Sequence, residues 1–347
     1  MSGHRSFRVR TRLVLTAALS AGALAATGCL PGGAGAAGGE ERPAQEPVGR
    51  SAPANSSPFW VDPDSAAARQ VKEYKAQGRD QEATLLRRIS ERPAALWPAW
   101  DNPVADIRRA VRGATAEGRT TVLVAYDIPH RDCGMYSKGG AANAEAYREY
   151  IDSFARAVGD ARTVVVLEPD AVPHMVDGCT PAQYHEERYG LLAEAVDRLK
   201  RQPRTKVYLD AGNPAWIKDP GKLVEPLRRA GIAKADGFSL NVSNFQTTPS
   251  VTAFGTELSA LLGGSRFVVD TSRNGAGPLA GDGEEAWCNP PGRALGTPPT
   301  ENTGDARVAA YLWIKRPGES DGTCRGGPAA GTWWPEYALG LARRAKA

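Results

Sequence analysis

The chain has 347 residues, 41% of them hydrophobic, which is enough for one large globular domain with a substantial core. Its formal charge of +4 comes from four arginines in the first 29 residues, a stretch without any acidic residue. Without these four, 39 basic residues face 39 acidic ones, and this balance gives no reason to expect nucleic acid as a partner.

The N-terminal segment predicts export. A basic start precedes an apolar run, residues 13–26, which is too short to span a bilayer comfortably. Ala26-Thr27-Gly28-Cys29 resembles a bacterial lipobox in which Cys29 would be lipidated, while Ala34-Gly35-Ala36 offers an ordinary cleavage site as the alternative. We therefore assign residues 1–29 to a signal peptide. We expect a protein that is either secreted or lipid-anchored at the outer face of a bacterial cell membrane.

The next segment, residues 30–57, predicts a linker. It is rich in Gly, Ala, Pro, Ser and Glu, a composition that cannot bury a core and is typical of flexible connections. We assign the remainder, residues 58–347, to a single catalytic domain that begins near Phe59.

Helical and strand-like patterns alternate through this domain. The expected helices are residues 66–88 with a break at Gly78, then 104–118, 143–158, 181–202, 223–230, 251–262 and a C-terminal helix from Pro335. The expected strands are a short one at 94–97, then 120–125, 163–167, 206–209, 237–240, 266–269 and 309–314. Helices of this length between strands imply right-handed crossovers and a parallel sheet. About seven strands over this length favour a barrel or distorted barrel over an open sheet.

Several strands finish in carboxylates. The segments that follow four of them are Tyr126–Cys133, Glu168–Asp170, Asp210 and Lys315–Gly322. Because the carboxyl ends of parallel strands meet at one edge, these groups should gather at a single site. The four histidines show no metal-ligand spacing, so we expect no metal site. Carboxylates without a metal indicate acid and base catalysis on a neutral polar substrate.

The cysteines predict disulfides. Cys29 stands apart, and four cysteines remain in the domain. An even number in an exported protein indicates two bridges, for which three pairings exist. Sequential pairing, Cys133–Cys179 and Cys288–Cys324, would staple two loops of the expected site, and this is the pairing that we predict.

Six segments in chain order carry a family resemblance. They are Tyr126–Cys133, Leu167–Asp170, Tyr208–Gly212, Asn241–Asn244, Trp287–Asn289, and Trp313–Lys315 with Gly318–Gly322. Together they resemble glycoside hydrolase family 6, the β-1,4-glucan hydrolases once called cellulase family B. The resemblance covers nearly the whole domain. It implies a distorted, partly open parallel β/α barrel, a reaction that inverts the anomeric configuration, no cofactor, and a β-1,4-glucan polysaccharide or oligosaccharide as substrate.

The resemblance also implies catalytic roles. Asp170 matches the general acid, which must stay protonated near neutral pH through burial or a nearby negative charge. Asp132 matches the carboxylate that raises this pKa and helps position water. Asp321 matches the debated base, and its implied partners Arg273 and Lys315 should lower its pKa and make it a poor base. A water chain that relays the proton to Asp132 is the alternative route.

Further positions match residues that hold the sugar. Tyr126 matches a residue that crowds the sugar at the cleavage point, and Trp216 and Trp287 match sugar-stacking platforms. The positions that match hydroxyl-binding residues are Asn213, Asn244, Lys315 and Glu319, and the expected supporting residues are Arg131, Asp210 and Arg273. Taken alone, Asp170 could be a helix N-cap and Tyr126 a core tyrosine. Asp64, Asp219 and Asn213 stand where other members often have Trp, Trp and His, which predicts weaker outer subsites.

The expected activity is therefore that of an exported, monomeric endo-β-1,4-glucanase. Members that thread chain ends through a tunnel carry long loops after the positions of Cys133 and Gly322, and both loops are short here. Two alternatives stay open. One is a cellobiohydrolase of the same family, and the other is a surface lipoprotein that binds glucan without cutting it.

Overall fold

The computed structural model describes residues 57–99, 101–281 and 283–346. The predicted signal peptide, the lipobox with Cys29 and all of the predicted linker before Ser57 lie outside these ranges. No helix within them is both long and apolar enough to cross a membrane.

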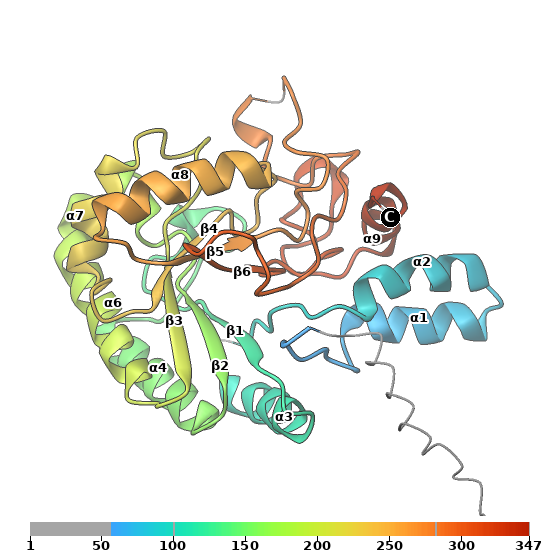
Figure 1. Ribbon diagram of the computed structural model, residues 1–347, viewed down its shortest axis with the longest axis horizontal. Coiled ribbons are helices and arrows are strands. Elements are labelled where there is room, and N and C mark those ends of the chain that lie inside the picture. The colour runs from blue at the N-terminus through green and yellow to red at the C-terminus, as the bar shows by residue number, and fades with distance from the viewer. Residues whose placement is uncertain (1–56, 100, 282, 347) are drawn as a thin grey trace, which may run out of the picture. The chain divides into compact units, whose positions relative to one another are not determined.

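Six parallel strands form one sheet in which the spatial order follows the chain order (Figure 1). The strands are β1 Thr121–Ala125, β2 Thr163–Leu167, β3 Thr205–Asp210, β4 Gly237–Leu240, β5 Phe267–Asp270 and β6 Val308–Leu312. β1 and β2, with the sequences TVLVA and TVVVL, are buried along their whole length. Continuous β-branched runs of this kind are typical of parallel strands covered on both faces. The sheet curls into a half-barrel, as expected from the distorted barrel of the family.

The seventh predicted strand, residues 94–97, is not a strand. Leu96 forms only an isolated parallel bridge with Leu123 of β1, and the neighbouring Ala95 donates its N–H to Trp313 O just after β6. The segment therefore touches both edges of the sheet and partly spans the opening. Pro93 and Pro98 flank it, and because proline has no N–H to donate, the pairing cannot extend in either direction.

Nine helices lie within the described ranges. They are α1 Ala66–Ala76, α2 Asp80–Ser90, α3 Pro103–Ala116, α4 Ala144–Val158, α5 Pro173–Val176, α6 His185–Lys200, α7 Gly221–Arg229, α8 Thr248–Leu261 and α9 Pro335–Arg344. The predicted helix at 66–88 is two helices, with Gly78 at a φ of 72° in the turn between them. The short α5 had no counterpart among the predicted elements, and it carries part of the site.

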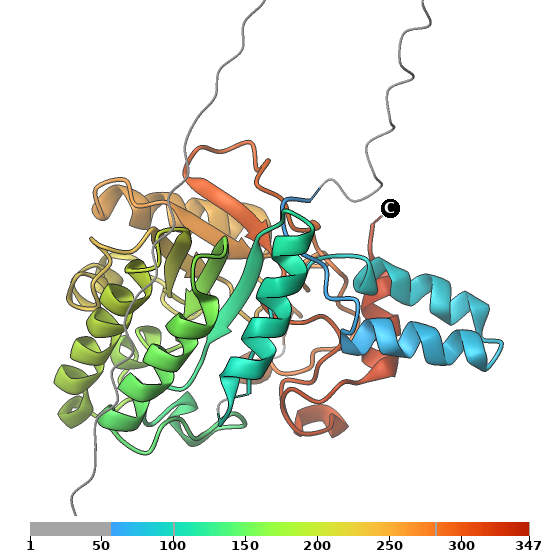
Figure 2. The same ribbon diagram turned by 90° about the horizontal axis from the view of Figure 1, so that it is seen from below.

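The core lies on both faces of the sheet. One buried cluster joins the strands to α4, α6, α7 and α8, which follow one another around the outside (Figures 1 and 2). A second cluster fills the inner face around Val124, Val166 and Ile314. A third joins α1 and α2 to α9. Each fully buried Leu, Val or Phe contributes about 1.5–3 kcal/mol, so this framework can hold the loops at the strand ends in place.

Candidate active site

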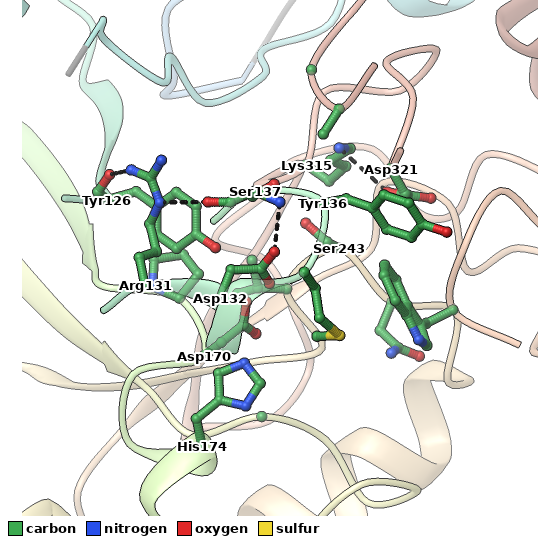
Figure 3. Close-up of a pocket in the computed structure, with 18 of the residues that line it drawn as sticks. Tyr126, Arg131, Asp132, Tyr136, Ser137, Asp170, His174, Ser243, Lys315 and Asp321 are labelled. Carbon is green, nitrogen blue, oxygen red and sulfur yellow. Dashed lines mark hydrogen bonds and ion pairs between the residues drawn. The ribbon is translucent and has the colours of Figure 1, made fainter. Parts of the chain in front are cut away.

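A cleft of about 910 Å³ lies at the carboxyl ends of the strands (Figure 3). It is lined by eleven of the predicted site residues, namely Tyr126, Arg131, Asp132, Asp170, Asn213, Trp216, Asn244, Trp287, Lys315, Glu319 and Asp321. The predicted supporting residues Asp210 and Arg273 lie behind it, each in contact with a carboxylate group or its backbone. Segments up to 195 residues apart in the sequence, from Tyr126 to Asp321, thus meet in one place.

Buried carboxylates at the strand ends hold these loops to one another. Glu168 after β2 accepts the backbone N–H groups of Asp127 and Ile128 after β1, all at 3.0 Å. Asp270 at the end of β5 accepts N–H groups of Ser243 and Lys315, from the loops after β4 and β6. Because a buried N–H without a partner costs free energy, each carboxylate fixes the backbone of a neighbouring loop.

Asp170 is the carboxyl group best suited to donate a proton. Its backbone N–H donates to Asp210 Oδ2 at 2.9 Å, and Asp210 in turn accepts the Ser239 hydroxyl. Burial raises the pKa of Asp170, and the negative charge of Asp210 raises it further. Its side chain does not cap a helix, since Val172 occupies the N-cap of α5 and no side chain caps that end. A carboxyl group held protonated near neutral pH can act as a general acid.

Asp132 lies beside Asp170. It begins a short 3₁₀ turn, Asp132–Gly134, and Oδ2 accepts the N–H of Ser137 at 2.5 Å. One carboxylate oxygen of each residue lies within 4.8 Å of the other, closer than the roughly 6.5–9.5 Å between a directly acting acid and base in inverting glycosidases. Burial raises the pKa of Asp132. In this position the Asp132 carboxylate can keep Asp170 protonated and can contact water in the cleft.

Asp321 has the opposite electrostatics. Burial alone would raise its pKa, but Arg273 and Lys315 lower it below the ordinary value. Arg273 Nη1 lies 2.8 Å from Oδ2, Lys315 Nζ lies 3.3 Å from Oδ1, and the N–H of Asn289 donates at 3.0 Å. A carboxylate stabilised by two cations binds a proton weakly, which makes it a poor direct base.

Arg131 fixes the position of Tyr126. The guanidinium donates to the carbonyl oxygens of Tyr126 and Ser137, and it lies over the tyrosine ring at 4.5 Å from the centroid. Trp97, which the sequence analysis did not single out, packs its ring edge to face against Tyr126 at 5.3 Å and also lines the cleft. The Tyr126 ring is therefore held at the cleft wall, where it packs against the buried cluster of the inner face.

Two aromatic side chains offer flat surfaces to the cleft. Trp216 is half-buried, and its indole N–H donates to Asp177 Oδ2 at 2.8 Å. Trp287 faces Tyr136, with ring centroids 6.1 Å apart. Tyr136 also packs over Gly322, where a Cβ atom would lie 2.3 Å from the ring. The loop after Asp132 thus contacts the Asp321 loop through an aromatic side chain that is 43% exposed.

The predicted hydroxyl-binding residues differ in how much of each side chain is free. The side-chain oxygens of Asn213 and Asn244 accept backbone N–H groups of their own loops, which leaves the amide nitrogens for a ligand. Glu319 is buried and paired with Arg316 at 2.8 Å. Lys315 donates to Ser320 O as well as facing Asp321. Asp64 and Asp219, which stand where tryptophan was expected from the resemblance, do not line the cleft. Asp219 instead accepts the N–H of Gly221.

Backbone strain is concentrated in the same loops. The non-glycine residues with positive φ are His130, Asp132, Cys133, Glu168, Asp170, Asn241, Ser243, Asn289 and Arg325. All but Arg325 lie in the segments that follow β1, β2 and β4 or in the Trp287–Asn289 motif. Left-handed backbone costs such residues of order 1 kcal/mol or more and persists only where surrounding contacts impose it.

Both predicted disulfides are present. Cys133–Cys179 joins the Asp132 turn to the loop after α5, and Cys288–Cys324 joins the Trp287 loop to the Asp321 loop. The sequential pairing is therefore confirmed, and each bridge ties together two loops of the cleft.

The sequence analysis did not recognise four residues of the site. Glu168 and Asp270 accept backbone N–H groups of neighbouring loops, Ser137 donates its N–H to Asp132, and His174 lies beside the carboxylates. Asp270 follows the pattern of a strand that ends in a carboxylate, so the same argument could have identified it. His174 was set aside with the other histidines, yet it is 4% exposed and lies beside Asp132 and Asp170. Asp170 and His174 are four residues apart in the segment after β2, whereas Asp132 follows β1, so no local spacing relates all three side chains.

Among the residues that the structure describes, two groups of side chains have the ligand types that a metal would need. In the first, Cys133 and Cys179 flank His174, but their sulfur atoms form a disulfide and are not available as thiolates. In the second, Asp132, Asp170 and His174 come together, but burial raises the pKa of both carboxyl groups and favours a proton over a cation. We assign neither as a metal site.

The chain is similar to known glycoside hydrolases. Residues 54–345 match the family described as Glycosyl hydrolases family 6. Endoglucanase A of Cellulomonas fimi is 41% identical over 85% of this chain and 63% of that protein. Endoglucanase 1 of Streptomyces halstedii is 44% identical over 81% of this chain and 87% of that protein. The chain thus spans less than two thirds of the length of some curated relatives and most of others.

The fold also matches solved structures. The endoglucanase Cel6 from Mycobacterium tuberculosis, determined in complex with methyl-cellobiosyl-4-deoxy-4-thio-β-D-cellobioside, superposes with a TM-score of 0.77 at 44% identity. The match covers 83% of this chain and 97% of that one. Endoglucanase CEL6B from Humicola insolens gives a TM-score of 0.73 at 26% identity.

Proposed function

The chain belongs to glycosyl hydrolases family 6, and on this premise we propose that it hydrolyses internal β-1,4-glucosidic bonds of cellulose or a related soluble β-glucan with inversion. The observation that carries the proposal is the contrast between two carboxyl groups in one cleft. The pKa of Asp170 is raised and the pKa of Asp321 is lowered. Carboxyl groups whose environments drive their pKa values apart are typical of acid and base roles.

In the proposed reaction Asp170 protonates the glycosidic oxygen as the bond to the anomeric carbon breaks. A water molecule attacks that carbon from the opposite face and loses its proton to a base. Because Asp321 is held ionised by two cations, we infer that it stabilises positive charge at the sugar and that the proton passes through water to Asp132. The Tyr126 ring crowds the cleavage point, and Trp216 and Trp287 hold the neighbouring sugars by stacking.

Internal cutting is favoured over release from chain ends. The relatives named above are endoglucanases. The loops beside Asp132 and Asp321 are short, and the Tyr136 ring that lies between them is exposed. A chain can therefore enter the cleft anywhere along its length and leave after each cut.

The viscosity of carboxymethyl cellulose, followed together with reducing ends, tests this proposal. We expect viscosity to fall steeply while few reducing ends appear. Release of cellobiose with little change in viscosity would instead indicate a cellobiohydrolase. Binding to the glucan without any new reducing ends would indicate a non-catalytic glucan-binding protein.

We also propose that the protein acts outside the cell as a monomer. The basic and apolar N-terminal segment and the Ala26–Cys29 motif support export, and the two disulfides fit an oxidising compartment. Cell fractionation with mass spectrometry of the Cys29 peptide would separate a lipid anchor from free secretion. Recovery of the full-length chain in the cytoplasm would refute export, and a dimeric mass on gel filtration would refute the monomer.

A further inference from the structure

His174 is a buried histidine at the floor of the cleft that the proposed reaction leaves without a role. It lies on the short helix α5, four residues after Asp170, and its N–H donates to the Asp170 carbonyl oxygen at 2.9 Å. The side chain points toward the two carboxylates (Figure 3), and one ring nitrogen lies within 4.8 Å of an oxygen of both Asp132 and Asp170. In the described part of the chain, neither ring nitrogen has a partner within hydrogen-bond distance.

The ring is held from the other side. Nδ1 faces Asp177 Oδ2 at 3.6 Å, and this same oxygen accepts the indole N–H of Trp216 at 2.8 Å. The Trp216 ring packs edge to face on the imidazole at 4.9 Å. One carboxylate thus fixes both the histidine and the proposed sugar platform. The Cys133–Cys179 disulfide closes the remaining side.

The charged groups that raise the pKa of His174 are carboxylates, while the Arg188 guanidinium on α6 donates to Ala171 O and Thr180 Oγ1 nearby. Asp177 follows α5, Asp170 precedes it, and Asp132 approaches from the loop after β1, with Asp210 behind Asp170. Burial alone would lower the pKa of His174, but Asp177, Asp170 and Asp132 raise it. The effect is mutual, because the imidazolium lowers the pKa of both Asp132 and Asp170 against the burial that raises them.

We propose that His174 is a positioning residue of the catalytic cluster, whose imidazolium sets the pH range in which Asp132 is ionised while Asp170 is still protonated. Two carboxyl groups within 4.8 Å of each other repel when both are charged. A cation facing both reduces that repulsion and stabilises the negative charge that develops on Asp170 as it gives up its proton. This role rests on the proposed function, in which Asp170 is the acid and Asp132 receives the proton.

The test is the pH profile of kcat/KM on a soluble cello-oligosaccharide for the wild type and His174→Gln. Without the cation both carboxyl groups should hold their protons to higher pH, so both limbs of the profile should move to higher pH. For a unit charge at this distance the expected shift is about 0.6–2.5 pH units, for effective dielectric constants of about 80 to 20. His174→Lys, which keeps a charge, should bring the limbs back toward the wild-type positions.

The matched control is His185→Gln, which removes the imidazole that contacts Thr180 O on the adjoining segment, away from the carboxylates. Its profile should keep the wild-type limbs. If His174→Gln lowers the rate uniformly and leaves both limbs in place, His174 acts only through packing and the proposal fails.

A second measurement needs neither hydrolysis nor a folded His174 variant. In the wild type, the imidazole ¹⁵N signals should show His174 protonated to higher pH than an ordinary histidine, and Asp170→Asn should lower the His174 midpoint. A neutral His174 ring across the range of about pH 5–8 would overturn the proposal. If the wild type does not hydrolyse β-glucan, the proposed function fails, while this titration still reports whether His174 is coupled to Asp170.

Discussion

At the residue scale, the site uses one functional group in three electrostatic states. Asp170 is partly buried beside other carboxylates, Asp321 is buried beside two cations, and Glu168 is buried with backbone N–H donors at its oxygens. The side chains are chemically equivalent, so their neighbours decide which gives up a proton, which stays charged and which holds the backbone.

Replacing Asp170 with Asn should remove general acid catalysis. We expect hydrolysis of carboxymethyl cellulose to fall by roughly 10²–10⁴-fold, because no proton donor remains for the leaving oxygen. An aryl cellobioside with a very acidic phenol should lose much less, since its leaving group needs no proton. Asp160→Asn, on the exposed surface after α4, serves as the control for handling and folding. Near wild-type activity of Asp170→Asn on the polymer would refute the assignment of the acid.

Glu168→Gln should change how stability depends on pH. Burial raises the pKa of Glu168 to about 7, above an unfolded value near 4.5. The folded form therefore binds the proton more tightly, and the resulting stabilisation is present below the unfolded pKa and is lost as pH rises through about 7. Glutamine does not titrate, so the variant does not lose this stabilisation as pH rises. The difference in unfolding free energy, variant minus wild type, should therefore increase by about 2–3 kcal/mol from pH 5 to pH 8. Urea unfolding of both proteins at the two pH values measures this. Parallel pH dependences would show that Glu168 is not the titrating group.

At the element scale, the strands could be predicted and the loops could not. The runs at 163–167 and 237–240 have the bounds that the sequence predicted, because apolar β-branched segments between helical patterns leave few alternatives. Residues 94–97 look equally strand-like, yet the flanking prolines limit them to one bridge. The turn α5, only four residues long, gives no periodic pattern that could be detected.

The candidate site divides in the same way. The strand-end carboxylates Asp132, Asp170 and Asp210 could be found from the sequence, since position at a strand end is visible in the hydrophobic pattern. The role of His174 and the contact of Tyr136 with Gly322 depend on how separate loops meet. Such contacts are set by tertiary packing, which no local pattern encodes.

The bridge between the Trp287 and Asp321 loops should be worth several kcal/mol. Cys288 and Cys324 are 36 residues apart, and the chain-entropy model gives about 4 kcal/mol for a loop of this length. Replacing both with Ser should lower the unfolding free energy by about this amount in urea. Activity should also fall, because Asn289 next to Cys288 holds Asp321. A wild type treated with reductant is the control, and an unchanged urea midpoint in the double variant would contradict the prediction.

At the scale of the whole molecule, the parallel order of the sheet makes the site. Each strand runs in the same direction and pairs with the next, so every loop that follows a strand opens onto the same edge. The carboxylates of one loop then accept the backbone N–H groups of the neighbouring loops, as Glu168, Asp210 and Asp270 do. The same hydrogen bonds therefore join the loops to one another and position the carboxylates of the site.

The most direct test of the central claim is proton NMR of the first products from a soluble cello-oligosaccharide. The account predicts hydrolysis at internal bonds, with the new reducing ends appearing first as the α-anomer and only later equilibrating. Asp170 gives up its proton on one side of the bond, and water attacks the anomeric carbon from the other. New reducing ends that appear first as the β-anomer, or no new reducing ends at all, would contradict it.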